Sequence, residues 1–349
     1  DIKQKEGEGM ALRVGVIGLG DVSMIHLHSI KSSEKAELVA VCDIDETKSS
    51  LIENVNFYTD YIEMIQKEQL DCVHICLPHY LHYPVTKDVA NLGVNVLLEK
   101  PLCLDTEEAE KFIELSDSTD TNICICLQNR YNNTVENLKE IINSDVYGKV
   151  IGIKGLVTWN RPKEYYTVKP WRGKMEFAGG GVMINQAVHT LDLMQLLGGK
   201  IESIKGNVDN FLDYDIEVED TANAIINFEN GAKGVFFATI ANATNSSVEI
   251  EVVLEKGMFS IKDSKLYRNI DGELIEIAED ERLSGSKHYY GASHGKLINK
   301  YYDCLLSNSK DYVHIKDAIP SIKMIDSIRQ SSESRKTILW GDILCKNLQ

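Results

Sequence analysis

The first third of the sequence alternates short apolar runs with segments of helical periodicity, and this alternation restricts the fold more than any other feature. The apolar runs lie at residues 12–17, 37–42, 71–76, 94–98 and 122–127. They are apolar through most of their length, which is typical of strands buried on both faces of a sheet. Helical patterns lie between them, including one at 105–116 that Asp105 or Thr106 can cap. The alternation predicts a doubly wound parallel α/β sheet.

After about residue 130 the apolar runs alternate with polar residues, which is typical of an antiparallel sheet. The expected strands lie at 150–159, 221–228, 233–240, 247–255, 258–267 and 273–277. Asn230-Gly231, between two of them, is a strong hairpin signal. A helix is expected at 135–144. We therefore expect an α/β domain over residues 11–128 and an α+β domain over 129–349, the latter an open, largely antiparallel sheet with helices on one face.

The charge balance argues against several classes of function. The chain has 37 Lys+Arg and 53 Asp+Glu in 349 residues, so its net charge is −16. A field of this sign repels phosphate backbones and anionic lipids, so no nucleic acid or membrane surface is expected as a partner. No apolar stretch reaches the roughly 18 residues of a membrane span. Residues 1–10 lack the apolar core of a signal peptide, so we expect a soluble, cytoplasmic protein.

Five of the eight cysteines lie inside strand-like apolar runs, where a free thiol behaves as a small hydrophobe. Cys72 and Cys76 form one spaced pair, and Cys124 and Cys126 form another. Neither pair repeats the CxxC spacing of zinc sites. We expect no disulfide and no metal ligands.

A glycine turn joins the first strand to the first helix. Gly18 permits the tight turn, and Gly20 lets the backbone approach a pyrophosphate at the helix N-terminus, where Asp21 and Val22 follow. Ser23 replaces the third glycine of this motif and is small enough to allow close packing of helix on strand. The turn predicts a dinucleotide site.

The end of the second strand indicates which dinucleotide is bound. Asp43 lies 25 residues after Gly18, near the roughly 20 expected for a carboxylate that binds the ribose hydroxyls of NAD. Ile44 stands where an arginine would suit the 2′-phosphate of NADP. We expect NAD as the cofactor, with NADP second. The alternative is an ordinary glycine turn with a helix-capping aspartate.

Two further polar segments, 77–82 and 98–101, follow strands at the edge where doubly wound sheets bind their ligands. Lys100 closes an apolar strand there, and partial loss of hydration lowers the pKa of such a lysine. Positive charge on an oxidised nicotinamide would lower that pKa further. The alternative is an exposed loop lysine.

From about residue 12 to 340 the sequence resembles the family of glucose–fructose oxidoreductase, inositol dehydrogenase and rhizopine-catabolism proteins (Gfo/Idh/MocA). The motifs that carry the resemblance are the glycine turn with His26, Pro78 with His82, Glu99-Lys100-Pro101, and residues 179–192 with His189. The resemblance implies an N-terminal Rossmann domain, a catalytic Lys100 and an active-site His189. It also implies cofactor contacts from Asp43 and from residues flanking the nicotinamide, namely Pro78, His79, His82 and Glu99.

One position departs from the family pattern. Many members have an aspartate four residues before the histidine, and this chain has Asn185 there. On one helix, Asn185 and His189 would share a face. Asparagine can position a substrate hydroxyl but cannot accept a proton. We therefore expect Lys100 and His189 to divide the proton transfer, with Asn185 as a third member of the catalytic group.

Other residues are candidates for substrate binding besides Asn185 and His189. Arg130 lies at the expected domain junction, where it binds substrate or braces the two domains. Trp171 and Arg172 belong to an aromatic–arginine loop that suits a sugar face and an anionic group, or is simply held together by its aromatic rings. Asp192, one turn beyond His189, orients the histidine or only occupies its helix.

The favoured function is an NAD-dependent dehydrogenase acting on a secondary hydroxyl of a sugar, inositol or sugar derivative. A second possibility is a glycosidase that uses bound NAD transiently, because the family resemblance also covers such hydrolases. A third is a non-catalytic NAD-binding regulator. The presence of Lys100 and His189, and the absence of a basic patch, argue against the third.

Apolar residues on both faces of the later strands predict a homodimer or homotetramer. Val235 and Phe237 point one way, whereas Phe236, Ala238 and Ile240 point the other. We expect the domain's own helices, including about 296–306, to cover one face and a second copy to cover the other, because monomers rarely expose large apolar patches. The alternative is that the loop 159–173 covers this face.

Overall fold

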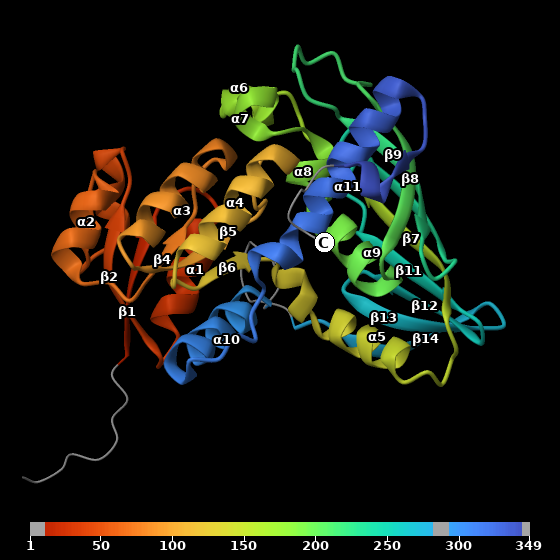
Figure 1. The fold of residues 1–349 in the computed structure, drawn as a ribbon, viewed down its shortest axis with the longest axis horizontal. Coiled ribbons are helices and arrows are strands. Elements are labelled where there is room, and N and C mark those ends of the chain that lie inside the picture. The colour runs from red at the N-terminus through yellow and green to blue at the C-terminus, as the bar shows by residue number, and fades with distance from the viewer. Residues whose placement is uncertain (1–10, 282–292, 344–349) are drawn as a thin grey trace, which may run out of the picture.

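The computed structural model describes residues 11–281 and 293–343, which form two sheets flanked by helices (Figure 1). The strands of the first sheet are β1 (Leu12–Ile17), β2 (Ala36–Cys42), β3 (Asn56–Tyr58), β4 (Cys72–Ile75), β5 (Asn95–Glu99) and β6 (Ile123–Cys126). All pair in parallel in the order β3-β2-β1-β4-β5-β6. This order is that of a Rossmann dinucleotide-binding sheet, so the expected fold of this part is confirmed.

Helices cover both faces of the first sheet. They are α1 (Ser23–Lys31), α2 (Tyr61–Glu68), α3 (His82–Asn91) and α4 (Thr106–Ser118), with the 3₁₀ segments η1 (Glu46–Leu51) and η2 (His79–Leu81). Helices α2, α3 and α4 pack in succession on one another, whereas α1 packs against α10 (Ser293–Ser307). Asp105 caps α4 by accepting a hydrogen bond from the Glu108 N–H at 2.8 Å. The sequence did not predict the short strand β3.

The second sheet has nine strands in the order β14-β13-β12-β11-β7-β10-β9-β8-β15. Their bounds are β7 (Val150–Thr158), β8 (Ile201–Asp209), β9 (Thr221–Phe228), β10 (Lys233–Thr239), β11 (Glu249–Leu254), β12 (Gly257–Lys262), β13 (Lys265–Ile270), β14 (Glu273–Glu279) and β15 (Ile338–Leu339). Every pair is antiparallel except β7 with β10. The largely antiparallel sheet and its Asn230-Gly231 hairpin agree with the sequence prediction.

Helices lie on one face of this second sheet. Those introduced here are α5 (Asn133–Asn143), α6 (Glu164–Thr167), α7 (Met175–Ala178), α8 (Val182–Asn185), α9 (Val188–Gly198) and α11 (Ile315–Ser334), with η3 (Gln128–Tyr131), η4 (Pro170–Gly173) and η6 (Trp340–Asp342). Helix α9 packs on β7, and α11 packs on β8. None of the helices among the described residues combines the length and apolar character needed to cross a membrane.

Two expectations about these elements were wrong. The single strand expected at 258–267 is two strands, β12 and β13, because Asp263 and Ser264 both adopt positive φ and make a tight turn. Helix α10 covers the first sheet instead of the second, because Tyr302 on it bonds His74 of β4 at 2.9 Å. The structure disfavours the alternative that the loop 159–173 covers the open sheet face, because Val235 and Ile225 on that face remain 48% and 49% exposed, and Lys169 of the loop binds Asp21 in the glycine turn.

Candidate active site

The glycine turn has the shape that a diphosphate requires. A Cβ on Gly18, whose φ is +92°, would lie 2.5 Å from the Cys76 carbonyl oxygen, so only glycine fits there. A Cβ on Gly20 would meet no atom within 4 Å, which leaves the backbone open to a ligand. Ser23 is fully buried and donates to the Gly20 carbonyl at 2.7 Å. No side chain caps the N-terminus of α1 at Val22, so the turn fits a dinucleotide phosphate.

Asp43 lies beside this turn at the end of β2. Its carboxylate accepts hydrogen bonds from the Leu19 N–H at 2.8 Å and from the Asp45 N–H at 3.0 Å. Burial alone raises the pKa of Asp43, but Lys48 at 2.8 Å and these backbone donors outweigh it, so the pKa lies below its ordinary value. Asp43 is therefore an anion in the place where a ribose-binding carboxylate is expected. The sequence analysis missed Lys48.

A buried chain of hydrogen bonds leads from α10 to Glu99, the residue before Lys100. His26 Nε2 lies 2.9 Å from Glu99 Oε1, His26 Nδ1 lies 2.9 Å from His74 Nδ1, and Tyr302 Oη lies 2.9 Å from His74 Nε2. Burial lowers the pKa of both histidines, so each ring carries one proton. One assignment satisfies every contact: Tyr302 donates to His74, His74 Nδ1–H to His26, and His26 Nε2–H to Glu99.

Glu99 remains charged at the end of this chain. Burial raises the pKa of Glu99, but hydrogen bonds from His26 and His294 reverse the effect and hold the pKa well below its ordinary value. The potential ligand atoms of four residues lie within 4.8 Å of one another, and these residues are His26, Glu99, Cys126 and His294. His26 Nε2 and Glu99 Oε1 already bond to each other, so these two atoms are not open to a metal ion. The expectation of no metal stays a prediction.

Lys100 follows β5 at the edge of the sheet that carries the glycine turn. Its Nζ donates to the Asn185 carbonyl oxygen at 3.0 Å. Burial lowers the pKa of Lys100 below its ordinary value and Arg172 adds to this, while the charge of Glu99 opposes it. A lysine with this pKa releases its proton more readily than one in water, which suits a general base.

His189 presents an unused hydrogen-bond donor. Its Nε2 lies 3.3 Å from the Gln128 side-chain nitrogen, so Nε2 accepts and the ring proton is on Nδ1. That Nδ1 is buried and has no hydrogen-bond partner among the described residues. Burial, followed by the charge of Lys100, lowers the pKa of His189 to about 3. The imidazole is therefore neutral, with one N–H available to a ligand.

Asn185 and His189 do not share a helix face, contrary to expectation. Helix α8 ends at Asn185 and α9 begins at Val188, so a break separates the two residues. The Asn185 side chain donates to the Gly180 carbonyl at 3.3 Å, and its main-chain oxygen receives Lys100. Asn185 thus holds Lys100 through the backbone.

Arg130 has the contacts of a bracing residue. It forms a two-point ion pair with Asp192, at 2.8 Å and 2.6 Å, and donates to the Asp317 carbonyl at 2.7 Å. These contacts connect η3 to α9 and α11. Asp192 therefore orients Arg130 instead of His189. Of the two roles considered for Arg130, bracing is the one that these contacts favour.

The residues expected to flank the nicotinamide divide into two groups. His82 is fully buried, and its ring nitrogens lie 2.7 Å and 2.9 Å from the carbonyl oxygens of Pro101 and Leu77. It therefore joins the loops after β4 and β5, next to Pro78. His79 packs its ring on Trp171 with ring centroids 4.9 Å apart, which brings the aromatic–arginine segment to the crevice.

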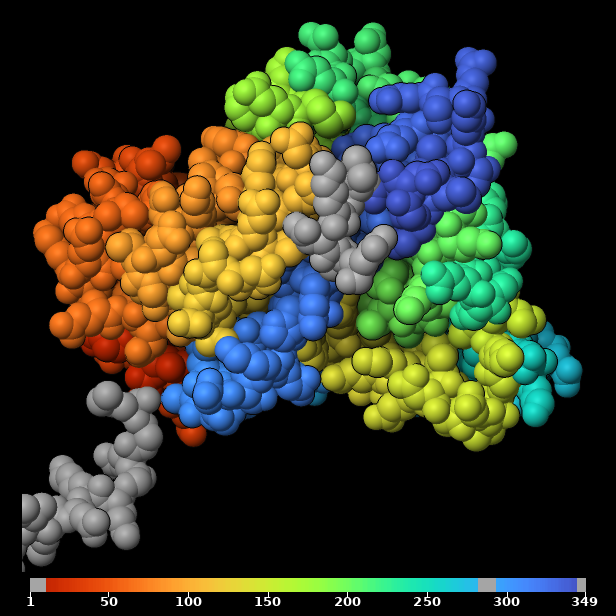
Figure 2. Space-filling view, in the orientation of Figure 1, coloured from red at the N-terminus to blue at the C-terminus, as the bar shows by residue number. Residues whose placement is uncertain are grey.

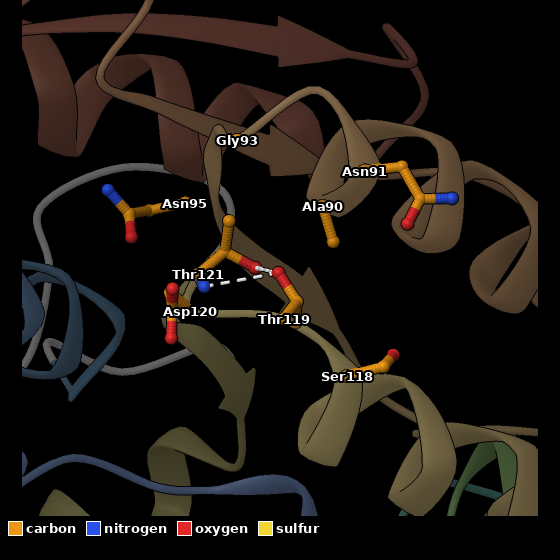
Figure 3. A pocket seen from close by; sticks show the side chains of 8 residues that line it. All are labelled: Ala90, Asn91, Gly93, Asn95, Ser118, Thr119, Asp120 and Thr121. Atoms are coloured by element: carbon orange, nitrogen blue, oxygen red, sulfur yellow. Dashed lines mark hydrogen bonds between the residues drawn. The ribbon is translucent and has the colours of Figure 1, made fainter.

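A shallow surface hollow elsewhere is unrelated to this site (Figure 3). It is lined by Ala90, Asn91, Gly93, Asn95, Ser118, Thr119, Asp120 and Thr121. Asn95 begins β5, and Thr121 precedes β6, so the hollow lies at the amino ends of the strands. Ligands of doubly wound sheets bind at the opposite, carboxyl ends, where Lys100 lies.

A Rossmann sheet, an open glycine turn and a buried lysine at a strand end are the features of a dinucleotide-dependent oxidoreductase. Residues 12–126 match the oxidoreductase family with an NAD-binding Rossmann fold, and residues 135–260 match the GFO/IDH/MocA C-terminal domain. The chain belongs to the GFO/IDH/MocA oxidoreductase family, as its motifs suggested.

Relatives of known activity are distant. The chain is 24% identical over 312 residues to myo-inositol 2-dehydrogenase of Thermotoga maritima, covering 86% of this chain and 87% of that one. It is 22% identical over 317 residues to NADP-dependent D-xylose 1-dehydrogenase of Haloarcula marismortui, covering 88% and 84%. The WlbA dehydrogenase of Bordetella pertussis, solved with NADH and UDP-GlcNAcA, superposes with a TM-score of 0.81 at 25% identity, covering 95% and 99%.

Proposed function

We propose that the protein is an NAD-dependent dehydrogenase that oxidises a secondary hydroxyl of a sugar, inositol or sugar derivative. The observation that carries the proposal is that Lys100 lies close enough to His189 for its charge to lower the pKa of that imidazole. Lys100 has a lowered pKa, and His189 has a buried Nδ1–H without a partner among the described residues. A hydroxyl group satisfies both, because it donates a proton and accepts a hydrogen bond. The sugar and inositol dehydrogenases among the relatives support this class of substrate.

The chain's own residues supply orientation and proton transfer. Neutral Lys100 takes the hydroxyl proton at Nζ, and His189 positions the same oxygen by donating from Nδ1. His189 does not act as the base, because its pKa of about 3 gives it little proton affinity near neutral pH. The dinucleotide supplies the hydride acceptor. The Asn185 carbonyl fixes Lys100 by accepting a hydrogen bond from Nζ.

Asp43 supports NAD over NADP. Its carboxylate accepts hydrogen bonds from ribose hydroxyls and repels a 2′-phosphate. Lys48 partly offsets that repulsion, since its ammonium is 2.8 Å from the carboxylate. The preference for NAD therefore depends on Asp43 remaining in place to hold Lys48.

A substrate screen tests the proposal. Polyols, sugars and sugar acids are incubated with the protein and NAD or NADP, and absorbance of the reduced cofactor is followed. We expect at least one polyhydroxy compound to give stoichiometric NADH. Hydrolysis of a glycoside without net NADH would indicate the glycosidase instead, and tight NAD binding with no turnover of any compound would indicate the regulator.

A further inference from the structure

Lys100 is held both at its peptide and at its amine. Its backbone N–H donates to Glu99 Oε2 at 3.1 Å, and its Nζ donates to the Asn185 carbonyl oxygen at 3.0 Å. Glu99 is only 3% exposed. A buried carboxylate without donors takes up a proton, because burial penalises the charged form. Glu99 therefore needs hydrogen-bond donors if it is to remain an anion beside Lys100.

Among the described residues, His26 is the side chain best placed to supply such a donor. His26 Nε2 is 2.9 Å from Glu99 Oε1, and both side chains are almost completely buried. His294 Nε2 is farther from the same oxygen, at 3.4 Å. The Cys126 thiol also lies near Glu99. Burial, followed by the charge of Glu99, raises the pKa of this thiol well above its ordinary value, so Cys126 stays neutral.

A second buried imidazole and a tyrosine hold the His26 ring in place. His26 Nδ1 is 2.9 Å from His74 Nδ1 on β4, and Tyr302 of α10 bonds the other nitrogen of His74. Helix α10 packs against α1, which carries His26, and Figure 2 shows α10 on the surface against the first half of the chain. Local sequence gives no signal for this chain of contacts, because Tyr302 and His74 are 228 residues apart.

Other titratable groups lie near Glu99 or Lys100. They are Cys76 of β4, His79 of η2, His82 of α3, Arg172 of η4 and His189 of α9. Burial raises the pKa of the cysteine and lowers the pKa of the three histidines, so these four side chains are neutral near neutral pH. Among the described residues, Glu99 is therefore the anion that acts most strongly on Lys100.

We propose that His26 is a positioning residue for Lys100 and acts through Glu99. By donating to Oε1, His26 keeps the Glu99 carboxylate charged. The carboxylate in turn stabilises the ammonium form of Lys100 and holds its peptide. Without the donor, Glu99 takes up a proton, and the Lys100 amine then loses its own proton at a lower pH. This role rests on the proposed function, which takes Lys100 as the base.

The test measures the ionisation of Lys100 without turnover. Acetic anhydride is small enough to reach a partly buried amine. Acetylation of Lys100 is followed over a range of pH by peptide mass spectrometry, with the exposed Lys87 of α3 as the internal standard. The wild type is compared with His26→Leu, which removes the donor, and with Glu99→Gln, which removes the charge but keeps an oxygen for the Lys100 N–H. In both variants we expect the pKa of Lys100 to fall by about 1 pH unit or more, the scale of losing a nearby opposite charge.

Three further variants separate this role from simple stabilisation of the fold. His26→Gln places an amide N–H near the position of Nε2 and should restore most of the wild-type profile. Tyr302→Phe removes a buried hydrogen bond of the same chain but leaves the contact of His26 with Glu99, so it should lower stability without moving the pKa of Lys100. The double variant His26→Leu/Glu99→Gln should show no further fall beyond Glu99→Gln alone, because the charge is already absent.

The proposal is overturned if His26→Leu leaves the pKa of Lys100 unchanged, if Tyr302→Phe lowers it as much, or if the two losses add in the double variant. If His26→Leu does not fold, His26→Asn decides, because the shorter amide takes the place of Nδ1 and leaves Glu99 without this donor. A wild type that turns over no polyhydroxy compound would instead contradict the proposed function. The acetylation profile needs no turnover, so the two failures are distinguishable.

Discussion

The charge state of Lys100 depends on its neighbours. Burial and Arg172 favour the neutral amine, whereas the anion Glu99 favours the ammonium. The buried histidine chain matters because it keeps Glu99 charged and thereby limits how far the lysine pKa falls. The pKa of the proposed base is therefore set by buried neighbouring groups.

The pH dependence of turnover follows from this arrangement. Hydroxyl oxidation needs Lys100 unprotonated, so its rate should rise with pH and level off at a pKa below the roughly 10.4 of a free lysine. Titration of His189 should add no further inflection to the pH–rate profile above about pH 5, because the pKa of His189 is about 3. Initial rates under saturating NAD and substrate measure the profile. A rate that is flat or falls as pH rises toward 10 would argue against Lys100 as the base.

Cofactor choice is a second prediction at this scale. The wild type should prefer NAD, and Asp43→Ala should lose the preference, because it removes the repulsion and frees Lys48 for a 2′-phosphate. Asp43→Ala should therefore use NADP better than the wild type does, and the double variant Asp43→Ala/Lys48→Ala should not show this improvement. Comparing kcat/KM for the two cofactors measures both effects. Equal use of NADP by the wild type would contradict the prediction.

At the scale of elements, the break between α8 and α9 decides how the site is built. The sequence predicts one helix, because nothing between Asn185 and Val188 is a proline or glycine. In the structure, the break turns the Asn185 carbonyl toward Lys100 and leaves His189 near the start of α9. A main-chain contact of this kind gives no local sequence signal.

The ion pair of Arg130 with Asp192 joins three elements, and its loss should destabilise the fold. Arg130→Met leaves the Asp192 carboxylate, which is 1% exposed, buried without its partner. Breaking a buried pair on one side costs about 3–5 kcal/mol. Urea unfolding measures the loss. Arg130→Met with normal stability and a raised KM for substrate would favour the substrate-binding role instead.

The local features of the fold could be predicted from sequence, whereas contacts between distant residues could not. Apolar runs located β1, β2 and β5, because buried strands carry their own signal. Strand β8 was missed, since Ile201, Ile204 and Val208 are its only large apolar residues. Lys169 and Asp21 are 148 residues apart, and their contact depends on how the chain folds back, which no local spacing encodes. Lys48 follows Asp43 by only five residues, but their contact depends on the η1 turn that begins between them.

At the scale of the whole molecule, one face of the second sheet has no helix on it within residues 11–281 and 293–343. Phe236 is 1% exposed on the helix-covered face, whereas Val235 and Ile225 are 48% and 49% exposed on the other. The alternative cover, the loop 159–173, leaves Val235 and Ile225 about half exposed, and its Lys169 binds Asp21 in the glycine turn. We therefore still expect a second copy of the chain on this face.

Light scattering at micromolar concentration tests the oligomer. The mass should be at least twice the 39.2 kDa of one chain, and the double variant Val235→Glu/Ile225→Lys should lower it. Lys87→Glu, at an exposed position of α3 beside the first sheet, controls for a charge change away from this face. A wild-type mass near that of one chain would contradict the prediction.

The central claim is that Lys100 is the base of an NAD-dependent oxidation, and one comparison tests it directly. Turnover and NAD affinity are measured together for the wild type and Lys100→Met on the substrate found by the screen. We predict a fall in kcat of about 10²–10⁴-fold, the usual scale for a general base, with NAD affinity within a few-fold of the wild type. Near-normal turnover in Lys100→Met would contradict the account.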